Sequence, residues 1–485
     1  MSSSVPIWAS SSSQTRAAFT NLDGRRVMLV SISDGDNRGA LTVHDAAVLE
    51  RAFRSAREER VPIVGLLSTS GVDVAEGVEA VVGWGRAASE LVKSSGVVPI
   101  LLAATGPVVS GPALMLGLAD FTFFTADAYA FVSGPHMVAS FTGVPITAEE
   151  LGGAGSHARS SGVATMIVAD GDEVIEAMSA VLSYLPDHVD VLPERAETSD
   201  PIDRDTAIAA TTVPSHPTGS YDVRDIIRDL ADDDEFLEIR AAFAPNLVTG
   251  FATIDGFTVG IVANQSQALA GSIDIPASHK GARFVQACDS FGIPLITLVD
   301  TSGFLPGKDL EWRGMIRHGA QLAFAYARAT VPRIALIIRK SYGGAYIVMD
   351  SRYMGNDLML AWPNAEVAVM GAKGAVEILH RKASPDERVQ LELDYEAQLP
   401  HAVSHGGTGL DQRGDRPDRH STRNRCGVGD ADHETGAVAS PSPRQHAAVI
   451  RQRSSVAGLD QADFGNNLGR PELPTNPHRR VHSDR

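Results

Sequence analysis

Two stretches of this chain are built to the same plan and keep the same order. Residues 61–71 read VPIVGLLSTSG, and residues 293–303 read IPLITLVDTSG. After each stretch, a Val-Pro pair leads an apolar run into a glycine loop, and a further short run ends at another glycine. The offset between equivalent positions is the same to within one residue for Pro62 with Pro294 and for Pro99 with Pro332, and it is slightly larger for Gly134 with Gly371. We interpret this pattern as an internal duplication that gives two copies of one domain.

The repeated unit has a chemical meaning. Each copy contains short β-branched runs of the kind that form buried strands, and these runs end in Gly or Ser-Gly. Glycine lets the backbone turn with positive φ and come close to a ligand. Backbone N–H groups left free at such a turn form an oxyanion hole, which needs no particular side chain. A duplicated chain is therefore expected to have two such holes.

Composition and charge limit the class of protein. The chain has 485 residues, of which 44% are hydrophobic and 21% charged. Because single cores stop growing at roughly 250 to 300 residues, we expect two domains. The formal net charge of −17 argues against nucleic acid as the main partner, because phosphate contacts need clustered Lys and Arg.

The two cysteines and the apolar segments bear on location. Cys288 and Cys426 are far apart in sequence, so they provide neither a disulfide framework nor a four-thiolate zinc site. We therefore expect no metal in this chain and a reducing cytoplasm as its location. The first ten residues lack the pattern of a secretory signal. Residues 96–124 are apolar but interrupted by Gly and Pro, which predicts strand, glycine loop and buried helix instead of a membrane span.

The order of the predicted elements is that of an α/β protein. Residues 22–30 read as a turn that feeds a strand, and residues 43–60 as an amphipathic helix. A strand around Leu67, a helix over residues 80–92 and a strand over residues 99–104 follow.

These predictions divide the chain into five parts. They are an N-terminal segment (1–21), a first domain (22–191), a linker (192–222), a second domain (223–400) and an atypical tail (401–485). The linker is predicted from four prolines among polar residues.

The second domain has helix signals of its own. Residues 222–230, 277–291 and 313–328 are predicted to be helical, the last two placed before strands of the repeat. Asp232 to Glu235 are interpreted as solvated charge, with the cap of a following turn as the other reading.

Short motifs in both halves carry a resemblance to a known family. In the second half they are residues 263–271 (ANQSQALAG), 282–285 (ARFV), 303–307 (GFLPG), 317–320 (RHGA), 342–346 (YGGAY) and 365–372 (AEVAVMGA). Residues 131–135 (FVSGP) and 150–154 (ELGGA) match in the first half. From about residue 22 to about residue 399, the chain resembles the carboxyltransferase β subunits of biotin-dependent acyl-CoA carboxylases. The resemblance implies two tandem crotonase-like (ClpP/crotonase) domains, which accounts for the repeat.

The resemblance also implies the site. In this family a carboxyl group passes from carboxybiotin to the α-carbon of an acyl-CoA, and negative charge develops on the thioester oxygen and on the biotin ureido oxygen. Ser110 and Gly111 then form the hole for the thioester enolate, and Gly371 and Ala372 the hole for biotin. The implied acyl-CoA contacts are Ser70, Gly71, Ser110, Gly111 and Gly134, and the implied biotin contacts are Gly343, Gly344, Ala345, Gly371 and Ala372.

Partners follow from the same resemblance. Biotin is expected on an α subunit that combines biotin carboxylase and biotin carboxyl carrier functions. The chain is expected to form a homohexamer in which each site lies between the first domain of one copy and the second domain of another. The expected reaction carboxylates acetyl-CoA or propionyl-CoA to malonyl-CoA or methylmalonyl-CoA. Two alternatives stay open: a subunit of a biotin-dependent decarboxylase, and a non-catalytic structural or regulatory paralogue.

Several residues have a second reading. Asp300 begins a DTSG stretch that resembles an aspartyl protease signature, although a turn at a strand end is favoured. His157 and His318 are candidates for acid or base groups, with hydrogen-bonding roles favoured. Ser341 lies before a glycine pair but outside a nucleophile elbow. Arg317 is a candidate for CoA phosphates or for a surface ion pair.

The chain departs from the family at three places. Asp73 stands where the family has a cation, and Pro112 replaces a residue with a backbone N–H in the first hole. From His401 onward there is no Lys, Met, Trp or Tyr, and Phe464 is the one aromatic residue. Such a segment buries little core. We interpret it as the product of a shifted reading frame near Leu399, with a disordered tail as the alternative.

Overall fold

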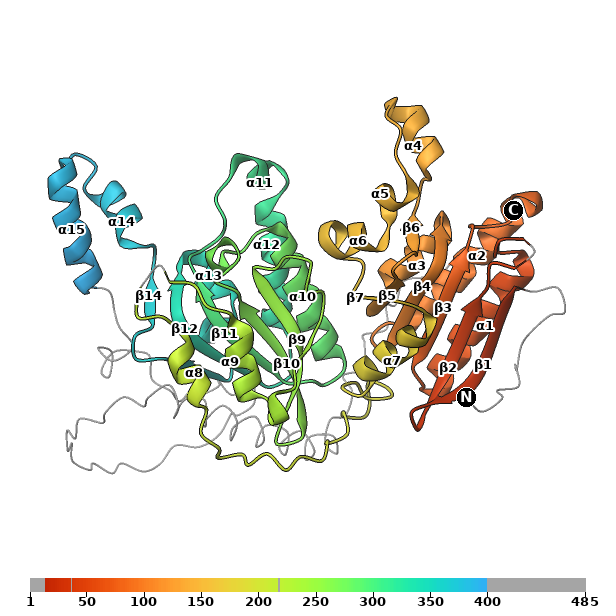
Figure 1. Ribbon diagram of the computed structural model, residues 1–485, viewed down its shortest axis with the longest axis horizontal. Coiled ribbons are helices and arrows are strands. Elements are labelled where there is room, and N and C mark those ends of the chain that lie inside the picture. The colour runs from red at the N-terminus through yellow and green to blue at the C-terminus, as the bar shows by residue number, and fades with distance from the viewer. Residues whose placement is uncertain (1–13, 36, 217–218, 399–485) are drawn as a thin grey trace, which may run out of the picture.

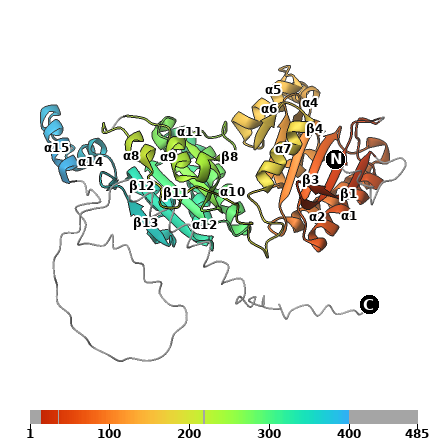
Figure 2. The ribbon, with the colours of Figure 1, turned by 60° about the horizontal axis from the view of Figure 1, so that its bottom comes forward.

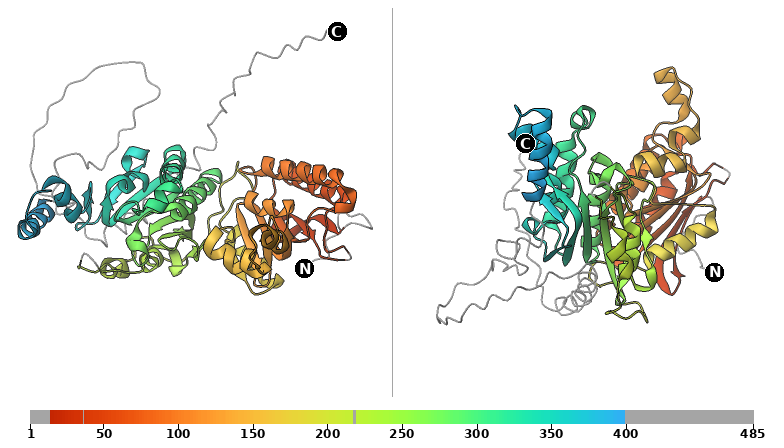
Figure 3. Two further views of the ribbon diagram at one scale, coloured as in Figure 1. Left: turned by 90° about the horizontal axis from the view of Figure 1, so that it is seen from above. Right: turned by 60° about the vertical axis from the view of Figure 1, so that its left-hand side comes forward.

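The computed structural model describes residues 14–35, 37–216 and 219–398, and within them the chain forms two similar α/β units side by side (Figure 1). Views from other directions show the two units next to each other along the long axis of the molecule (Figure 3).

The first unit is built on a seven-stranded sheet with the order β1-β2-β3-β4-β5-β7, and β6 pairs with β4. The β1–β2 pair is antiparallel and the other pairs are parallel. The strands are β1 (Thr15–Leu22), β2 (Arg25–Ile32), β3 (Ile63–Thr69), β4 (Ile100–Val109), β5 (Phe121–Thr125), β6 (Tyr129–Phe131) and β7 (Met166–Val168). The helices are α1 (Val43–Glu59), α2 (Val78–Ser94), α3 (Leu114–Leu118), α4 (Pro135–Thr142), α5 (Ala148–Gly152), α6 (Ala154–Ser156) and α7 (Gly171–Leu182).

The second unit repeats this arrangement with the order β13-β12-β11-β10-β9-β8, and β14 pairs with β12. Helices α9 and α12 lie on opposite sides of its sheet (Figure 2). The strands are β8 (Leu237–Glu238), β9 (Leu247–Ile254), β10 (Phe257–Asn264), β11 (Leu295–Thr301), β12 (Arg333–Tyr342), β13 (Leu358–Ala361) and β14 (Glu366–Ala368). The helices are α9 (Val223–Leu230), α10 (Ile275–Ser290), α11 (Lys308–Trp312), α12 (Met315–Arg328), α13 (Gly343–Val348), α14 (Ala372–Leu379) and α15 (Pro385–Gln398).

Within the described residues, the six strands β1 to β6 correspond in order to β9 to β14, whereas β7 and β8 each lack a counterpart. The pair β3–β4 shifts its register between Leu67 and Thr69, and the pair β11–β12 shifts it between Val299 and Thr301, which are the equivalent positions of the repeat. Helices α1 and α10 also begin at equivalent positions. The duplicated α/β fold predicted from the sequence is therefore confirmed.

Local sequence explains the main elements. Helix α1 buries one face, and Thr42 and Asp45 form a capping box at its start, which satisfies two backbone donors. It ends where Arg60 adopts a left-handed conformation. Strand β11 is buried along its whole length, as expected for the central strand of a parallel sheet covered on both faces.

One apolar cluster joins the two units. The ring of Phe121 in β5 meets the ring of Phe251 in β9 edge-on, with centroids 5.9 Å apart. Phe251 also contacts Tyr184 and Phe284, with centroid distances of 5.7 and 5.1 Å. Such aromatic pairs contribute about 0.5–1.5 kcal/mol each beyond the area they bury. The two domains therefore share part of one core, and this core sets how their facing surfaces meet.

Three details differ from the sequence predictions. The first sheet begins at β1, before the predicted domain start at residue 22, because this edge strand is partly polar and lacks the apolar run on which the prediction relied. The predicted linker contains a short helix, α8 (Ala207–Thr212). Asp232 is 1% exposed and accepts hydrogen bonds from the N–H groups of Asp255 and Gly256, so it is not a solvated charge.

Two further predictions concern residues outside the described part of the chain. The altered tail from His401 onward and the second cysteine, Cys426, both lie there. Within residues 14–35, 37–216 and 219–398, no helix has the length and apolar character needed to cross a bilayer.

Candidate active site

Three loops meet at one edge of the first sheet. They follow β3 at Ser70 and Gly71, β4 at Ser110 and Gly111, and β6 at Gly134. The strands are neighbours, since Thr69 pairs with Val108 and Val109 pairs with Phe131. A Cβ added at Gly71 would lie 3.2 Å from the Cβ of Ser110, so the first two loops touch. The five substrate residues predicted in this domain therefore lie on three adjacent loops.

The second sheet brings its predicted residues together in the same way. Gly343, Gly344 and Ala345 begin α13 directly after β12, and Gly371 and Ala372 begin α14 after β14, which pairs with β12. A Cβ added at Gly371 would lie 3.5 Å from the ring of Tyr342, the last residue of β12, which is an ordinary van der Waals contact. The two loops of this edge are therefore neighbours.

Matching hydrogen bonds hold the loops after β3 and β11. The N–H of Gly71 donates to Thr69 Oγ1 at 3.1 Å, and the N–H of Gly303 donates to Thr301 Oγ1 at 3.3 Å. The carbonyls of both glycines accept a backbone N–H, from Leu41 at 2.8 Å and from Ile273 at 3.0 Å.

The next residue in each loop keeps a free donor. Among the described residues, the N–H groups of Val72 and Phe304 have no acceptor, and neither do those of Gly111 and Gly344. Each sheet edge therefore carries two unpaired backbone donors on adjacent loops, which is the arrangement that an oxyanion needs.

In each domain a glycine packs directly against the backbone at the end of the strand that precedes the loop. Gly39 has φ +67°, and a Cβ there would lie 2.2 Å from the carbonyl oxygen of Ser68. Gly271, its equivalent in the second copy, has φ +68°, and a Cβ there would lie 2.2 Å from the carbonyl oxygen of Asp300. No other residue type fits at either position without moving the end of the central strand.

The structure corrects one part of the predicted first hole. Ser110 has φ +64°, and its N–H donates to the carbonyl of Phe131 at 2.9 Å. Pairing between β4 and β6 thus continues to the end of the strand and uses this donor. Gly111 retains its N–H, because it is the first residue of the short helix Gly111–Ala113.

The departures at Asp73 and Pro112 have local structural roles. Asp73 caps the short helix Val74–Glu76 by accepting from the N–H of Ala75 at 2.8 Å, and it also accepts from Asn37 Nδ2 at 3.0 Å. Its carboxylate is therefore held by its own loop and by Asn37 of the loop before α1. Pro112 is buried at the second position of the helix after β4, where a missing N–H costs little.

Asp300 belongs to a buried network behind the second-domain loops. Its carboxylate is 2.9 Å from Arg339 Nη2 and accepts the hydroxyl of Tyr221 at 2.9 Å. Burial and the Asp300 charge raise the pKa of the Tyr221 hydroxyl well above its usual value. An ion-paired carboxylate enclosed in this way supports the strand end, as favoured from the sequence, and is not available as an acid or base.

Of the other candidate side chains, His157 and Tyr342 have structural partners and Ser341 is enclosed without one among the described residues. His157 is 2.8 Å from the carbonyl of Ala130 through Nε2 and 2.7 Å from Ser161 Oγ through Nδ1, so both ring nitrogens are engaged in hydrogen bonds. Ser341 is buried, and within the described chain its hydroxyl has no hydrogen-bond partner and hence no base. Tyr342 donates its hydroxyl to Glu366, and burial together with this bond raises the pKa of Tyr342.

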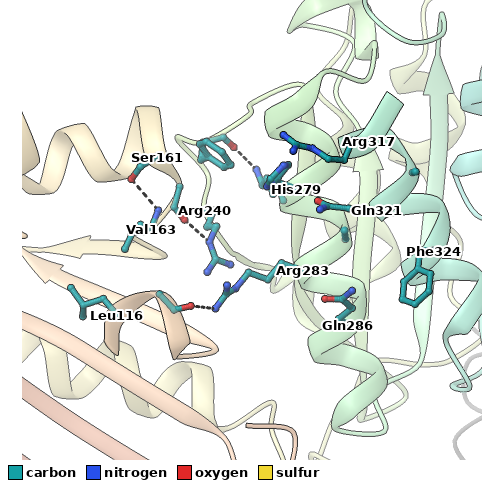
Figure 4. A pocket seen from close by; sticks show the side chains of 16 residues that line it. Leu116, Ser161, Val163, Arg240, His279, Arg283, Gln286, Arg317, Gln321 and Phe324 are labelled. Atoms are coloured by element: carbon teal, nitrogen blue, oxygen red, sulfur yellow. Dashed lines mark hydrogen bonds between the residues drawn. The ribbon is translucent and has the colours of Figure 1, made fainter. Parts of the chain in front are cut away.

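A separate cavity of about 520 Å³ lies between the two domains (Figure 4). Arg317, predicted as a CoA or ion-pair residue, lines it and donates to His318 Nε2 at 3.1 Å. His318 in turn contacts His279. The lining includes none of the glycines of the two sheet edges.

Sequence reasoning missed three groups of residues. The free donors of Val72 and Phe304 come from residues with ordinary side chains, and backbone hydrogen bonding alone distinguishes them. Gly39 and Gly271 carry a usable signal, since their spacing equals that of the main repeat. The cations of the cavity meet only through the packing of the domains.

Comparison with known proteins adds the family. The sequence profile described as the carboxyl transferase domain matches residues 17–417. The propionyl-CoA carboxylase beta chain of Roseobacter denitrificans is 40% identical over 392 residues, covering 80% of this chain and 77% of that protein. The methylmalonyl-CoA decarboxylase subunit alpha of Veillonella parvula is 36% identical over 390 residues, covering 80% and 77%. The crystal structure of the transcarboxylase 12S hexamer with methylmalonyl-coenzyme A bound matches with a TM-score of 0.83 and 32% identity, over 96% of this chain and 84% of that one.

Proposed function

The chain belongs to the carboxyl transferase domain family, and on that basis we propose that it carboxylates propionyl-CoA or acetyl-CoA at the α-carbon. The products are methylmalonyl-CoA and malonyl-CoA. The relatives named as propionyl-CoA carboxylase beta chains favour this reaction over a decarboxylase role or a non-catalytic role.

The duplicated pairs of free backbone donors carry this proposal. Carboxyl transfer to a thioester develops negative charge on two separate oxygens, one on each reactant. Val72 and Gly111 offer N–H groups at one sheet edge, and Phe304 and Gly344 offer them at the other. Donors placed in advance at a developing oxyanion contribute about 3–4 kcal/mol each to transition-state stabilisation in other enzymes.

The first-domain edge suits the thioester. Gly111 donates to the enolate oxygen, and Val72 is the second donor in place of Ser110, whose N–H is already used. Ser70, Gly71 and Gly134 form the adjacent backbone walls of this site. No general base is required from the chain, which agrees with the hydrogen bonds that already engage both ring nitrogens of His157.

The second-domain edge suits a biotin ureido group. Gly343, Gly344 and Gly371 lack Cβ atoms where a flat ring would approach the backbone, and Ala372 begins a helix whose first N–H groups have no intrahelical acceptor. Carboxybiotin, when bound, supplies the carboxyl group that is transferred. The residues of this edge hold and orient the ring and stabilise charge on its oxygen.

Partners complete the proposal. An α subunit with biotin carboxylase and biotin carrier functions is proposed to deliver biotin, since this chain resembles β chains. A homohexamer is proposed because the related transcarboxylase 12S core is described as a hexamer. The cytoplasmic location stays a prediction.

The test uses the reverse reaction. Purified full-length chain is incubated with malonyl-CoA or methylmalonyl-CoA, with and without free biotin as carboxyl acceptor, and loss of the carboxyl group is measured. We expect decarboxylation that depends on biotin, and the ratio of the two rates gives the acyl preference. A folded chain without biotin-dependent turnover would contradict the proposal and favour the non-catalytic paralogue.

A matched pair of variants separates the donor from the side chain. Gly111→Pro removes the N–H, whereas Gly111→Ala keeps it, and an added Cβ would lie 3.5 Å from the ring of Trp84, an ordinary contact. The proline variant should lose roughly 100- to 1,000-fold in kcat, the effect of one oxyanion donor. Equal activity of the two variants, both shown to be folded by circular dichroism, would show that the Gly111 N–H is not a donor of the oxyanion hole.

A further inference from the structure

The cavity between the domains has an unbalanced charge. Arg240, Lys280, Arg283 and Arg317 line it, and no aspartate or glutamate is among its lining residues. Figure 4 shows the side chains of Arg240 and Arg283 directed into the space between the first and second domains.

Three of these cations are held by carbonyl groups and not by carboxylates. Arg240 Nε donates to the carbonyl of Gly162 at 2.9 Å, and Arg283 Nη2 donates to the carbonyl of Gly117 at 3.1 Å. Lys280 Nζ donates to the carbonyl of Phe243 at 2.8 Å. Within the described residues none of the three forms an ion pair. Asp120 acts on Arg240 and Arg283, and Glu238 acts on Lys280, only at longer range, so their charge is positioned and only partly balanced.

Burial makes this arrangement costly. Arg240 is 7% exposed and Lys280 is 2% exposed. Burial, with Arg283 as a second cause, lowers the pKa of Arg240 to about 9, and burial lowers the pKa of Lys280 to about 7. Asp120, whose pKa burial raises to about 6, is hydrogen-bonded to the N–H of Ile100 and does not line the cavity. An isolated buried cation is unfavourable unless an anion accompanies it.

We propose that this interdomain cavity binds a small phosphorylated metabolite, separately from the carboxyl-transfer site. Guanidinium forks match the geometry of phosphate oxygens, and here Arg240 and Arg283 line one cavity together with Lys280. The volume of about 520 Å³ lies in the usual range of small-molecule sites.

The remaining lining residues fit the non-phosphate part of such a ligand. Gln286 and Gln321 present amide groups, and Leu116, Phe243 and Phe324 present apolar surface. A ligand seated here would contact both domains, since Arg240 and Arg283 already bridge to carbonyls of the first domain. Binding should therefore stabilise the pairing of the two domains.

The binding test uses pyrophosphate and full-length protein in isothermal titration calorimetry. Gln321 is exposed on α12, so Gln321→Glu adds a negative charge to the lining at little risk to folding. Gln390→Glu, on exposed α15 outside the cavity, is the control with the same change in net charge. We expect Gln321→Glu to raise Kd at least roughly tenfold through charge repulsion, and Gln390→Glu to leave it unchanged. Equal binding by both variants, or no binding by the unaltered chain, would overturn the proposal.

Two further arms identify the source and the place of binding. Orthophosphate, AMP and ADP are titrated in turn, and tighter binding of the nucleotides than of orthophosphate would assign the site to an organic phosphate. Saturating acetyl-CoA is then added. Retention of pyrophosphate in its presence is expected, whereas complete displacement would place the anion in the acyl-CoA site and overturn the proposal.

Protonation provides an independent signature. Lys280 is acted on by Glu238, Arg240 and Arg224, and a bound dianion would draw a proton onto it near pH 7. Titrations in buffers of different ionisation enthalpy should show proton uptake that disappears in Lys280→Met. Proton uptake of the same size in that variant would show that Lys280 does not contact the bound anion, and it would overturn the assignment of a phosphate to this cavity. Carboxyl transfer by Gln321→Glu should be unchanged, so failure here is distinct from failure of the proposed reaction.

Discussion

Replacement of Gly39 by alanine tests whether a single backbone contact shapes the first glycine loop. With φ +67° at this position, a Cβ would lie 2.2 Å from the carbonyl oxygen of Ser68 and 3.0 Å from Thr69 Cα. Both obstacles are backbone atoms at the end of a buried strand, so no side-chain rotation relieves them. The strand end itself must move, and the loop at Gly71 moves with it.

The magnitude follows from two separate costs. A left-handed conformation costs alanine roughly 1–2 kcal/mol, and forcing extra volume into a packed interior costs typically about 1–3 kcal/mol more. Gly143 is the matched control, because it is left-handed with φ +75° at the end of α4 but has no atom within 4 Å of an added Cβ. We therefore expect Gly143→Ala to cost about 1–2 kcal/mol and Gly39→Ala about 2–5 kcal/mol, the difference arising from the contact.

Amide hydrogen exchange is the direct assay. The N–H of Ser70 donates to the carbonyl of Arg38 at 3.0 Å, so its protection reports whether the segment behind the loop stays in place. Each loss of about 1.4 kcal/mol in local stability should speed exchange about tenfold. Faster exchange in Gly39→Ala than in Gly143→Ala, with a parallel loss of malonyl-CoA decarboxylation, is expected. Equal exchange in the two variants would refute the reasoning.

Two further predictions concern buried charge. Asp300→Ala leaves the Arg339 guanidinium, which is 12% exposed, without its carboxylate, and it should lower the free energy of unfolding by about 3–5 kcal/mol. As the control, loss of the exposed Asp225–Arg228 pair should lower it by less than about 1 kcal/mol. Urea denaturation of both variants checks this, and similar midpoints would contradict it. Lys280, with its pKa lowered from 10.5 to about 7, binds its proton more weakly in the folded than in the unfolded chain between these values. The destabilisation that comes from burying the Lys280 charge is therefore complete below about pH 7 and vanishes as pH rises towards 10.5. Lys280→Met removes this charge together with its hydrogen bonds. The variant should therefore raise Tm most near pH 6, by the equivalent of about 2 kcal/mol. Parallel curves of Tm against pH for the two proteins would contradict this.

Much of the fold was predictable because the signal is repeated. The predicted helix over residues 43–60 is α1 and that over residues 80–92 lies within α2, since both helices bury one regular apolar face. The strand at Leu295 and the helix before it also form as predicted. The edge strand β1 escaped prediction because its contacts lie on one side and its sequence is mixed.

The site was predictable to the level of the loop and not of the atom. Glycine and serine content located the loops at Gly71, Ser110 and Gly343, but which N–H is free depends on pairing between strands. Ser110 loses its donor to Phe131, and no local pattern announces a partner that distant in sequence. Only the family resemblance assigned roles to the glycine, serine and alanine residues of these loops, because their side chains are too small to indicate a function.

The interdomain cations lie beyond sequence reasoning for another reason. Arg240 and Arg283 belong to the second domain, whereas the carbonyls of Gly117 and Gly162 that receive them belong to the first. Their convergence depends on the shared core around Phe251, which the separate domain patterns do not specify. Only the assembled chain shows that their charges meet.

The matched strand registers of the two sheets also determine which segments of one copy could replace the equivalent segments of the other. From Gly39 to Gly71 the offset to the second copy is constant, so that segment could be transplanted without altering loop lengths. The offset is still almost the same where β4 and β12 begin but is larger at β6 and β14, so the second copy is slightly longer between these strands. A chimaera grafted beyond that point would have to accommodate a change in length next to the buried pair of Arg333 and Asp350. The early half of each copy is therefore the natural unit for moving specificity from one reactant's site to the other's.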